Sequence, residues 1–501
     1  MNEALAELPR LATAHLQLSL AGLAFALALS LPLGIAAVRR PRLEAAVLGV
    51  ASVIQTIPSL ALLAIMVPLL AAIGFLPAWL ALTLYAALPI LRNTVTGIAG
   101  VEPALREAAR GVGMTPVQQL RRVELPLALP VIVAGVRTAA VWTVGTATLS
   151  TPVGAPSLGN LIFAGLQTRN GASVAVGCVA AALLALGLDQ TIGLLERGVS
   201  EGSRTRTRAA FVLLLALVGW AGGAFVWQRL GPQAKPIRIG AKPFTEQYVL
   251  AELLSATIER ETGRPTETLQ NLGSTVLFDA LEKGEIDAYV DYSGTLWATV
   301  LKQGGTPPGR AEVLAGVTRA LASEHGIRVA AALGFENTYA LALRRDRAAA
   351  LGLRRISDLA PRAPTLEIAG DYEWFQRPEW QALLAAYGLA FRATRTMDPT
   401  LLYAAVAEGA VDVISAYSTD GRVAAWDLML LEDDRGVIPP YDAVVLTSRA
   451  LAERAPDVVA ALGHLDATID AEAMRKMNLA VDRDGRTPRE VAREFLAARQ
   501  R

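Results

Sequence analysis

The sequence predicts a multi-domain chain in which an all-α transmembrane bundle is followed by a soluble α/β domain with two lobes. The chain has 501 residues, which is more than one compact domain usually contains. Hydrophobic residues make up 53% of it and are concentrated before Gln228. After Gln228, charged residues are spread evenly and helical and strand patterns alternate. A repeat within this second part predicts its two lobes.

Six apolar segments are long enough to cross a membrane. Segments 11–38 and 45–73 contain no charged residue, and about 20 apolar residues span the hydrocarbon core of a bilayer. The other four segments are 76–98, 127–149, 172–194 and 209–229. The first segment is too long for a cleaved signal peptide and follows no basic region. We expect a five-span domain over residues 1–200, and a sixth span with a linker over 201–234.

Basic residues are distributed unevenly among the loops between these segments. The loops 39–44, 92–126 and 196–208 fall on one side and carry twelve Lys or Arg residues, whereas the opposite side carries two, Arg10 and Arg169. Lys and Arg are enriched in cytoplasmic loops. The pattern therefore predicts that the arginine-rich loops are cytoplasmic and that both termini and residues 235–501 are extracytoplasmic.

A charged, glycine-containing segment between the third and fourth apolar segments has a specific spacing. Glu-Ala-Ala is followed by three residues, a glycine, nine residues and then Val-x-Leu-Pro. The glycine permits a tight turn, and the proline is expected to start the next helix. The coupling motif of bacterial ABC-importer permeases is similar to this pattern within residues 100–126, although a generic interfacial loop is the alternative. The motif residues are Glu107, Ala108, Ala109, Gly113, Leu125 and Pro126.

The second half of the chain contains an internal repeat. "ALEKGEIDAYVDYS" (280–293) and "AVAEGAVDVISAYS" (405–418) align at a constant offset of 125 residues. Each reads as a helix, a glycine, and a strand that ends at a tyrosine, Tyr292 or Tyr417. Ligands of open α/β sheets bind beyond the carboxyl ends of strands. We therefore expect a clamshell that closes about a hinge, with lobe 1 at about 235–338 and 440–501 and lobe 2 at about 339–439.

Four tyrosines follow strand-like or turn segments, and two helices are expected to begin with hydroxyl residues. The tyrosines are Tyr292, Tyr339, Tyr417 and Tyr441. Aromatic faces attract cations, and cages of them suit quaternary ammonium groups, which cannot donate hydrogen bonds. Thr245 is expected to cap one helix, and Ser274 and Thr275 to begin another. Helix N-termini favour anions such as a ligand carboxylate.

Several motifs together resemble the substrate-binding proteins of glycine betaine, carnitine and choline importers. They are "KPFTEQ", "LGST", "GEIDAYVDYSGT", "NTYALAL", "ISAYSTDGR" and "IPPYDAV". In the membrane half, "AVWTVGTATLSTPVGAPSLGNLI" is similar to the permeases of these systems. The resemblance covers nearly the whole chain, and fused chains of this layout include ergothioneine importers. It implies a bacterial inner-membrane location and a homodimer formed through the permease domain.

The resemblance also implies an aromatic cage drawn from both lobes, with polar anchors for a carboxylate. Arg377 could pair with that carboxylate bidentately, or it could be a surface residue at a helix start. The candidate ligand-binding residues are Thr245, Glu246, Ser274, Thr275, Tyr292, Asn337, Thr338, Tyr339, Arg377, Tyr417, Ser418, Thr419 and Tyr441. Glycine betaine, choline, carnitine, proline betaine and ergothioneine all stay open as substrates.

The sequence therefore favours the membrane and binding component of an importer that catalyses no covalent chemistry. It contains no G-x-x-x-x-G-K-[ST] phosphate loop, so ATP is expected to be used by a separate ATPase subunit. Neither a metal nor a resident cofactor is predicted, and the single cysteine excludes an intrachain disulfide. A membrane-tethered ligand sensor is the rival, but a sensor has no use for a coupling motif. Within the fourth segment, Arg137 is expected to face the bundle interior or to snorkel, and Asp189 to be interfacial.

Overall fold

The computed structural model describes residues 2–168, 170–230, 235–303, 309–371 and 373–499. Arg169 and most of the expected linker therefore lie outside the described residues. Contacts divide the chain into two compact units. One unit comprises Met1–Gly165 with Gly171–Gln233, and the other comprises Leu166–Asn170 with Ala234–Arg501.

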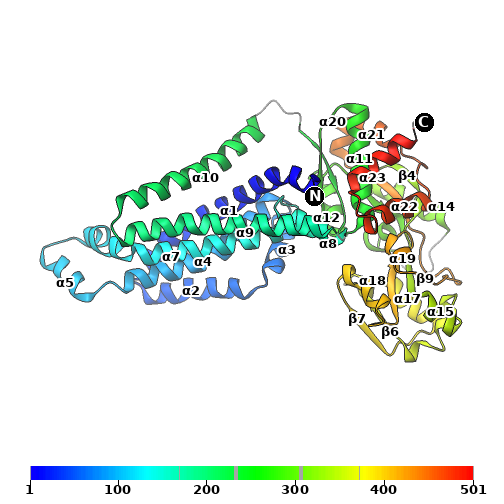
Figure 1. The fold of residues 1–501 in the computed structure, drawn as a ribbon, viewed down its shortest axis with the longest axis horizontal. Coiled ribbons are helices and arrows are strands. Elements are labelled where there is room, and N and C mark those ends of the chain that lie inside the picture. The colour runs from blue at the N-terminus through cyan, green and yellow to red at the C-terminus, as the bar shows by residue number, and fades with distance from the viewer. Residues whose placement is uncertain (1, 169, 231–234, 304–308, 372, 500–501) are drawn as a thin grey trace. The chain divides into compact units, whose positions relative to one another are not determined.

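The first unit is built from long apolar helices. Figure 1 shows α4, α7 and α9 running side by side, and α1 packs against each of them. Small buried side chains such as Ala26, Ala86 and Ala139 lie at these contacts and allow the helices to approach closely. The elements are α1 (Asn2–Ala37), α2 (Pro41–Thr56), α3 (Ser59–Leu70), α4 (Phe75–Ala99), α5 (Pro103–Gly111), α6 (Pro116–Gln119), the π-turn η1 (Leu120–Glu124), α7 (Leu125–Ala147), η2 (Thr148–Val153), α8 (Gly159–Gln167), α9 (Gly171–Ser200) and α10 (Arg204–Leu230).

The expected second span is broken. The described residues form five helices long and apolar enough to cross a membrane, or six spans if α2 and α3, which meet at a bend of 101°, form one. The break falls at Ile57, whose backbone is extended, immediately before Pro58. Proline disfavours a helical conformation in the residue before it, so the apolar segment 45–73 is divided between two helices, and its role as one span stays a prediction.

The helix that contains the fourth apolar segment starts earlier than expected. It begins at α6, where Thr115 and Gln118 form a capping box, and continues through η1 into α7. Pro126 lies in the first turn of α7, as predicted, and α6 and η1 extend the helix on its N-terminal side. The π-turn before it changes the local hydrogen bonding and lets the chain continue past a residue that has no N–H.

Arg137 on α7 is paired with two carboxylates of α9. Its Nε and Nη2 donate to the two carboxylate oxygens of Asp189 at 2.6 and 2.8 Å, and its Nη1 donates to Glu196 at 3.3 Å. Gly193 leaves room for the guanidinium, since a Cβ there would lie 3.3 Å from the guanidinium carbon. Asp189 is thus the partner of Arg137, and the bidentate pair joins α7 to α9, while its interfacial position stays a prediction.

We expect Asp189→Asn to lower the melting temperature of the purified full-length chain. The substitution leaves the Arg137 guanidinium with one carboxylate instead of two, and an under-compensated charge in an apolar bundle is destabilising. The double variant Arg137→Gln/Asp189→Asn removes both charges and should recover part of the loss. Thermal unfolding in detergent measures both effects, and an unchanged melting temperature for Asp189→Asn would contradict this account.

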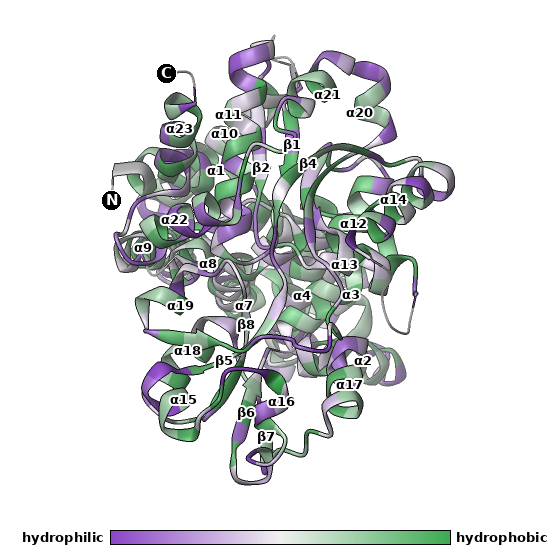
Figure 2. Ribbon diagram, turned by 90° about the vertical axis from the view of Figure 1, so that its right-hand side faces the viewer, coloured by the Kyte–Doolittle hydropathy of each residue, from purple (hydrophilic) through white to green (hydrophobic). Residues whose placement is uncertain are grey.

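The second unit contains two five-stranded sheets with the same arrangement. Their orders are β2-β1-β3-β10-β4 and β7-β6-β8-β5-β9, and in each only the fourth strand runs antiparallel to the other four. Strands β1 and β2 lie in the upper half of Figure 2, and β5, β6 and β7 lie in the lower half. The chain passes from the first sheet to the second after β4, and returns before β10.

The strands are β1 (Ile237–Gly240), β2 (Thr266–Leu269), β3 (Ala288–Tyr292), β4 (Arg328–Glu336), β5 (Tyr339–Arg344), β6 (Glu367–Gly370), β7 (Ala393–Thr396), β8 (Val413–Tyr417), β9 (Leu428–Leu430) and β10 (Asp442–Thr447). The helical elements are α11 (Thr245–Thr262), α12 (Ser274–Glu282), α13 (Ser293–Thr295), η3 (Leu296–Val300), α14 (Arg310–Ala320), η4 (Leu321–His325), α15 (Arg345–Leu351), α16 (Ile356–Leu359), η5 (Ala363–Thr365), η6 (Trp374–Gln376), α17 (Pro378–Tyr387), α18 (Pro399–Ala407), α19 (Gly421–Ala425), α20 (Arg449–Arg454), α21 (Pro456–Gly463), α22 (Ala471–Asp482) and α23 (Pro488–Ala498).

The repeat in the sequence has a structural basis. The glycines before β3 and β8, Gly284 and Gly409, both have positive φ angles, of 70° and 76°. Each following aspartate, Asp287 or Asp412, accepts a hydrogen bond at 2.9 Å from the first or second residue of a neighbouring parallel strand. Both repeats therefore end a helix, turn, and enter the centre of a sheet in the same way, which confirms the predicted strand ends at Tyr292 and Tyr417.

Candidate functional site

Aromatic side chains from both sheets meet in one cluster. Phe244, in the loop between β1 and α11, stacks on Tyr417 with 5.5 Å between ring centroids and lies 6.4 Å from Tyr292. Tyr339 lies 4.9 Å from Tyr417 and 5.7 Å from Tyr441. The four tyrosines singled out in the sequence are therefore brought together. We refer to these five residues, with Trp374 whose ring lies 4.8 Å from Tyr339, as the aromatic cluster.

Arg377 is buried against this cluster. Its guanidinium carbon lies 5.0 Å from the ring centroid of Tyr339 and 5.9 Å from that of Tyr441, distances typical of cation–π contacts. It donates to Glu373 at 2.7 Å, and its Nη2 donates to Glu379 at 2.9 Å and to the Tyr441 hydroxyl at 3.0 Å. Only 3% of its side chain is exposed, so it is not a surface residue, although it is the N-cap of α17 as the alternative expected.

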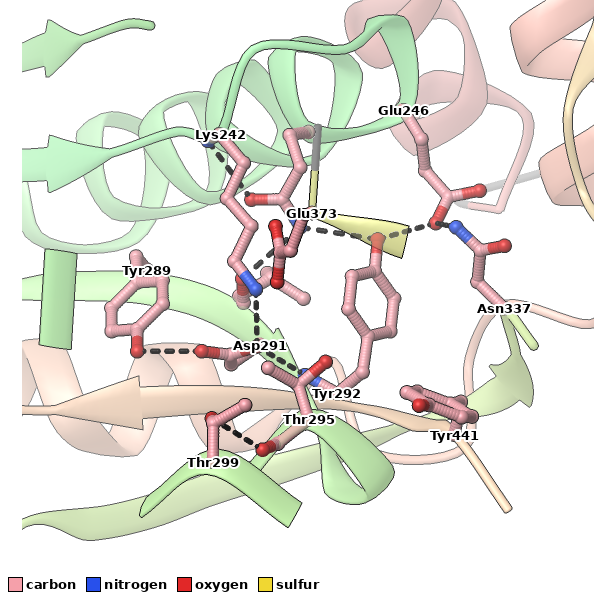
Figure 3. A network of polar contacts seen from close by, with 12 residues as sticks. Lys242, Glu246, Tyr289, Asp291, Tyr292, Thr295, Thr299, Asn337, Glu373 and Tyr441 are labelled. Atoms are coloured by element: carbon pink, nitrogen blue, oxygen red, sulfur yellow. Dashed lines mark hydrogen bonds and ion pairs between the residues drawn. The ribbon is translucent and has the colours of Figure 1, made fainter. Parts of the chain in front are cut away.

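Glu246 is a buried hydrogen-bond acceptor that joins the two lobes. Its carboxylate accepts from the Tyr292 hydroxyl at 2.6 Å, from the amides of Asn337 and Asn478 at 2.8 and 3.1 Å, and from the Thr419 hydroxyl. Figure 3 shows Tyr292, Glu246 and Asn337 in line. Burial raises the pKa of Glu246, and the four hydrogen bonds act in the opposite direction. The arrangement fixes the orientation of the Tyr292 ring.

We expect Glu246→Ala to lower the free energy of unfolding of the full chain's soluble half by at least about 2 kcal/mol, because four buried donors lose their acceptor. Glu246→Gln should cost less, since the unpaired Oδ1 of Asn337 could turn to accept from the new amide. Denaturant unfolding followed by fluorescence compares the two variants. Equal stabilities for wild type and Glu246→Ala would contradict the role assigned to this carboxylate.

A buried ion pair lies beneath Tyr292. The Nζ of Lys242 is 2.5 Å from an oxygen of Asp291, and the other oxygen accepts from the Tyr289 hydroxyl at 2.7 Å (Figure 3). The same Nζ lies 5.4 Å from the centroid of the Tyr292 ring. One side of that ring therefore faces a cation whose charge Asp291 balances.

Three other predicted residues form hydrogen bonds with neighbouring groups of the protein. Thr245 does not cap its helix: the N-cap is Phe244, and the Thr245 hydroxyl donates to Asp482 at 2.6 Å. The backbone N–H of Thr338 donates to the Ser418 hydroxyl at 3.0 Å. Thr338 and Ser418 also line a separate cavity of about 420 Å³, which Tyr339 borders.

Ser274 and Thr275 begin helix α12 as predicted, with Gly273 as the N-cap. Within the described part of the chain, neither takes part in the hydrogen bonds or ring contacts around the aromatic cluster. A role for them as carboxylate anchors stays a prediction.

The sequence analysis missed several residues of this site. Phe244 lies inside the quoted motif "KPFTEQ", and Trp374 lies in an aromatic-rich stretch, so composition could have indicated both. Tyr403 accepts a hydrogen bond from the Tyr417 backbone N–H at 3.3 Å. Asn478 reaches Glu246 from a helix 232 residues further along the chain, and no local pattern marks it.

The predicted coupling motif forms a short helix and a turn. Along α5, Glu107 and Ala108 are exposed, whereas Ala109 is buried against the rest of the unit. Gly113 has a φ angle of 78°, a conformation that side-chain-bearing residues rarely adopt, and a Cβ there would meet no atom within 4 Å. Val112, which directly precedes Gly113, is 74% exposed. The motif thus presents a small, partly apolar surface.

Comparison with known proteins places both halves of the chain. Residues 235–498 match the model of the substrate-binding domain of ABC-type glycine betaine transport systems. Residues 28–201 match the model of the inner-membrane component of binding-protein-dependent transport systems. The first match covers more than half of the chain. The chain belongs to the glycine betaine, carnitine and choline family of ABC importers.

Curated relatives agree with this assignment. The ergothioneine transport permease/ergothioneine binding protein EgtU of Helicobacter pylori is 30% identical over 478 residues, which are 93% of this chain and 85% of that protein. The choline transport system permease protein OpuBB of Bacillus subtilis is 41% identical over 39% of this chain and 89% of its own length. The carnitine transport binding protein OpuCC of Listeria monocytogenes is 32% identical over 53% of this chain and 87% of its own.

The importer chain therefore combines a membrane permease with the substrate-binding domain of a quaternary ammonium transport system. Its family implies an ATPase partner and a small solute. The membership confirms the importer prediction and does not favour the rival of a tethered sensor.

Proposed function

We propose that the aromatic cluster binds the trimethylammonium group of a betaine-type solute between the two lobes. The observation that carries this proposal is the meeting of Phe244, Tyr292, Tyr339, Tyr417 and Tyr441 from both sheets within contact distance. A quaternary ammonium group cannot donate a hydrogen bond, so ring faces are its natural partners. Because the rings come from both lobes, the lobes would have to close around the solute in order to bind it fully.

The charges around the cluster support a cationic group. Glu246, Asp420 and Asp482 line a small cavity together with Phe244 and Tyr417. On the other side, the Tyr417 hydroxyl donates to Asp371 at 3.5 Å. Acidic groups close to ring faces lower the free energy of a bound cation through the Coulomb interaction.

Arg377 supports a zwitterion rather than a simple cation as the solute. Its Nε and the Nε1 of Trp374 are buried donors without a hydrogen-bond partner within the described residues. A carboxylate beside the cluster could accept from both. This favours carboxylate-bearing solutes, such as the carnitine and ergothioneine in the names of the relatives, over choline.

We further propose that a separate ATPase subunit docks on the coupling motif and that two importer chains associate through their permease units. Exposed small residues on α5 and the open turn at Gly113 would let a helix end sit closely in a groove of the partner. ATP binding to that subunit would then switch the permease, and the soluble unit would deliver solute from the extracytoplasmic side of a bacterial inner membrane.

Calorimetric titration of the full-length chain in lipid nanodiscs tests the ligand proposal. We expect heats of binding for glycine betaine, carnitine or ergothioneine, and weaker or no binding of choline, which lacks the carboxylate. Neutral solutes of similar size, such as inositol, serve as the control. Binding of inositol but of none of the betaines would contradict the proposal.

The orientation can be tested separately. Because the arginine-rich loops predict a cytoplasmic side, we expect alkaline phosphatase fused after Leu230 to be active, since that enzyme works only outside the cytoplasm. A fusion after Arg110 should be inactive and provides the matched control. The reverse pattern would overturn both the orientation and the external position of the binding unit.

A further inference from the structure

A buried glutamate lies at the base of the coupling segment and contacts the helices around it. Glu124 is 4% exposed, and its side chain lies within η1 just before α7. It accepts from the Arg39 guanidinium at 3.2 Å and from the Gln119 amide at 2.8 Å, and it forms an ion pair with Arg106 at 3.6 Å. Arg39 comes from the α1–α2 connection and Arg106 comes from α5, so one carboxylate joins three segments.

The π-turn makes this arrangement possible. In a regular α-helix, residues five apart point about 140° away from each other, since successive residues turn by about 100°. A π-turn hydrogen-bonds residues five apart and so brings their side chains to the same face. Here Leu125 N–H bonds to Leu120, and the amide of Gln119 reaches Glu124 five residues later. The wider turn thus directs Glu124 inward at the junction of α6 and α7.

Arg106 extends the network to a fourth segment, the end of helix α4. Besides pairing with Glu124, it donates to the backbone carbonyls of Ile98 and of Ala99, the latter at 3.1 Å, at the C-terminal end of α4. Arg106 precedes the motif residue Glu107 on α5. The position of the motif helix is therefore fixed to α4 and α7 through side chains of one charged network, which consists of Arg39, Arg106, Gln119 and Glu124.

We propose that Glu124 is a positioning residue that transmits movement of the coupling helix to the membrane helices. A displacement of α5 would move Arg106, and the ion pairs of Glu124 would pass this movement to the start of α7 and to the α1–α2 connection. Movement of α5 when a partner binds its exposed surface would therefore rearrange α1, α4 and α7. This role rests on the proposed docking of an ATPase at the coupling motif.

The test uses Glu124→Gln in the full-length chain, reconstituted in proteoliposomes with its ATPase. Glutamine keeps the size of the side chain and one acceptor but removes the charge that holds Arg39 and Arg106. We expect solute uptake to fall by at least about tenfold, a change of about 1.4 kcal/mol. ATP hydrolysis and ligand binding should persist, so that the ratio of ATP hydrolysed to solute transported rises by a similar factor.

Glu201→Gln is the matched control, because Glu201 is exposed in the turn after α9 and lies outside both this network and the coupling segment. It should leave uptake and the ATP-to-solute ratio unchanged. Arg39→Gln removes one partner of Glu124 and should raise the ratio less than Glu124→Gln does.

The outcomes separate this proposal from the proposed function. If wild type shows no ATP-driven uptake, the proposed function fails. If wild type transports and Glu124→Gln has an unchanged ATP-to-solute ratio, the positioning role is wrong. A parallel loss of uptake and hydrolysis, or loss of the ATPase on co-purification, would assign Glu124 to folding or docking and would also overturn it.

Discussion

Tyr417→Ala is expected to weaken binding of a trimethylammonium solute by about tenfold or more. The Tyr417 ring lies between Phe244 of one lobe and Tyr339 of the other, so it faces whatever the lobes enclose. A cation–π contact is worth about 0.5–2 kcal/mol, and every 1.4 kcal/mol is about tenfold in affinity. Alanine also removes apolar contact area with the solute. Titration calorimetry of the folded variants in nanodiscs measures the loss.

Tyr417→Phe is the informative comparison, since it keeps the ring face and removes only the hydroxyl. That hydroxyl donates to Tyr339 and Asp371 at 3.3 and 3.5 Å, which are long and weak hydrogen bonds. The Tyr417→Phe variant should therefore bind the solute nearly as tightly as wild type. If it binds the solute as poorly as Tyr417→Ala does, the tyrosine acts through its hydroxyl. A cation–π contact with the Tyr417 ring would then be contradicted.

Gly113→Val and Glu107→Lys are expected to abolish uptake in proteoliposomes while ligand binding persists. A β-branched residue cannot readily adopt the φ angle of 78° at Gly113, so the turn after α5 would be distorted. Glu107 is exposed, and lysine reverses its charge on the surface proposed for the ATPase. Both residues belong to the first unit, whereas the residues proposed to bind the ligand belong to the second.

Gly113→Asn separates the two effects at the turn. Asparagine tolerates a positive φ angle, and a Cβ at this position would meet no atom within 4 Å. If the glycine serves only the backbone, this variant transports normally; if the partner packs closely on it, uptake falls although the turn is kept. Wild-type uptake by both Gly113→Val and Glu107→Lys would contradict the coupling assignment.

The sequence allowed the fold to be predicted where local chemistry decides structure. The helical membrane half follows from uncharged segments, and the paired lobes follow from a repeat whose Gly284 and Gly409 both adopt positive φ angles. The sequence did not reveal how two prolines act in their surroundings. Pro58 divides an uncharged segment into two helices, whereas the helix around Pro126 continues on its N-terminal side through a π-turn.

The site was predictable in its tyrosines and not in its supporting residues. Tyr292, Tyr339 and Tyr417 lie at strand ends and Tyr441 directly precedes a strand, so a period-two pattern and a turn locate them. The burial of Arg377 depends on how α17 packs, and the pairing of Glu246 with Asn478 joins residues 232 positions apart. Such contacts arise from tertiary packing, which leaves no trace in a local pattern.

One measurement tests the central claim that this chain is the transport and receptor component of a quaternary ammonium importer. The full-length chain is reconstituted with its ATPase in proteoliposomes, and uptake of a radiolabelled betaine that the chain binds is followed with and without ATP on the ATPase side. The account predicts accumulation that requires ATP and is lost in Tyr417→Ala at limiting solute. Tight binding of the betaine without any ATP-dependent accumulation would contradict it and would instead favour a tethered sensor.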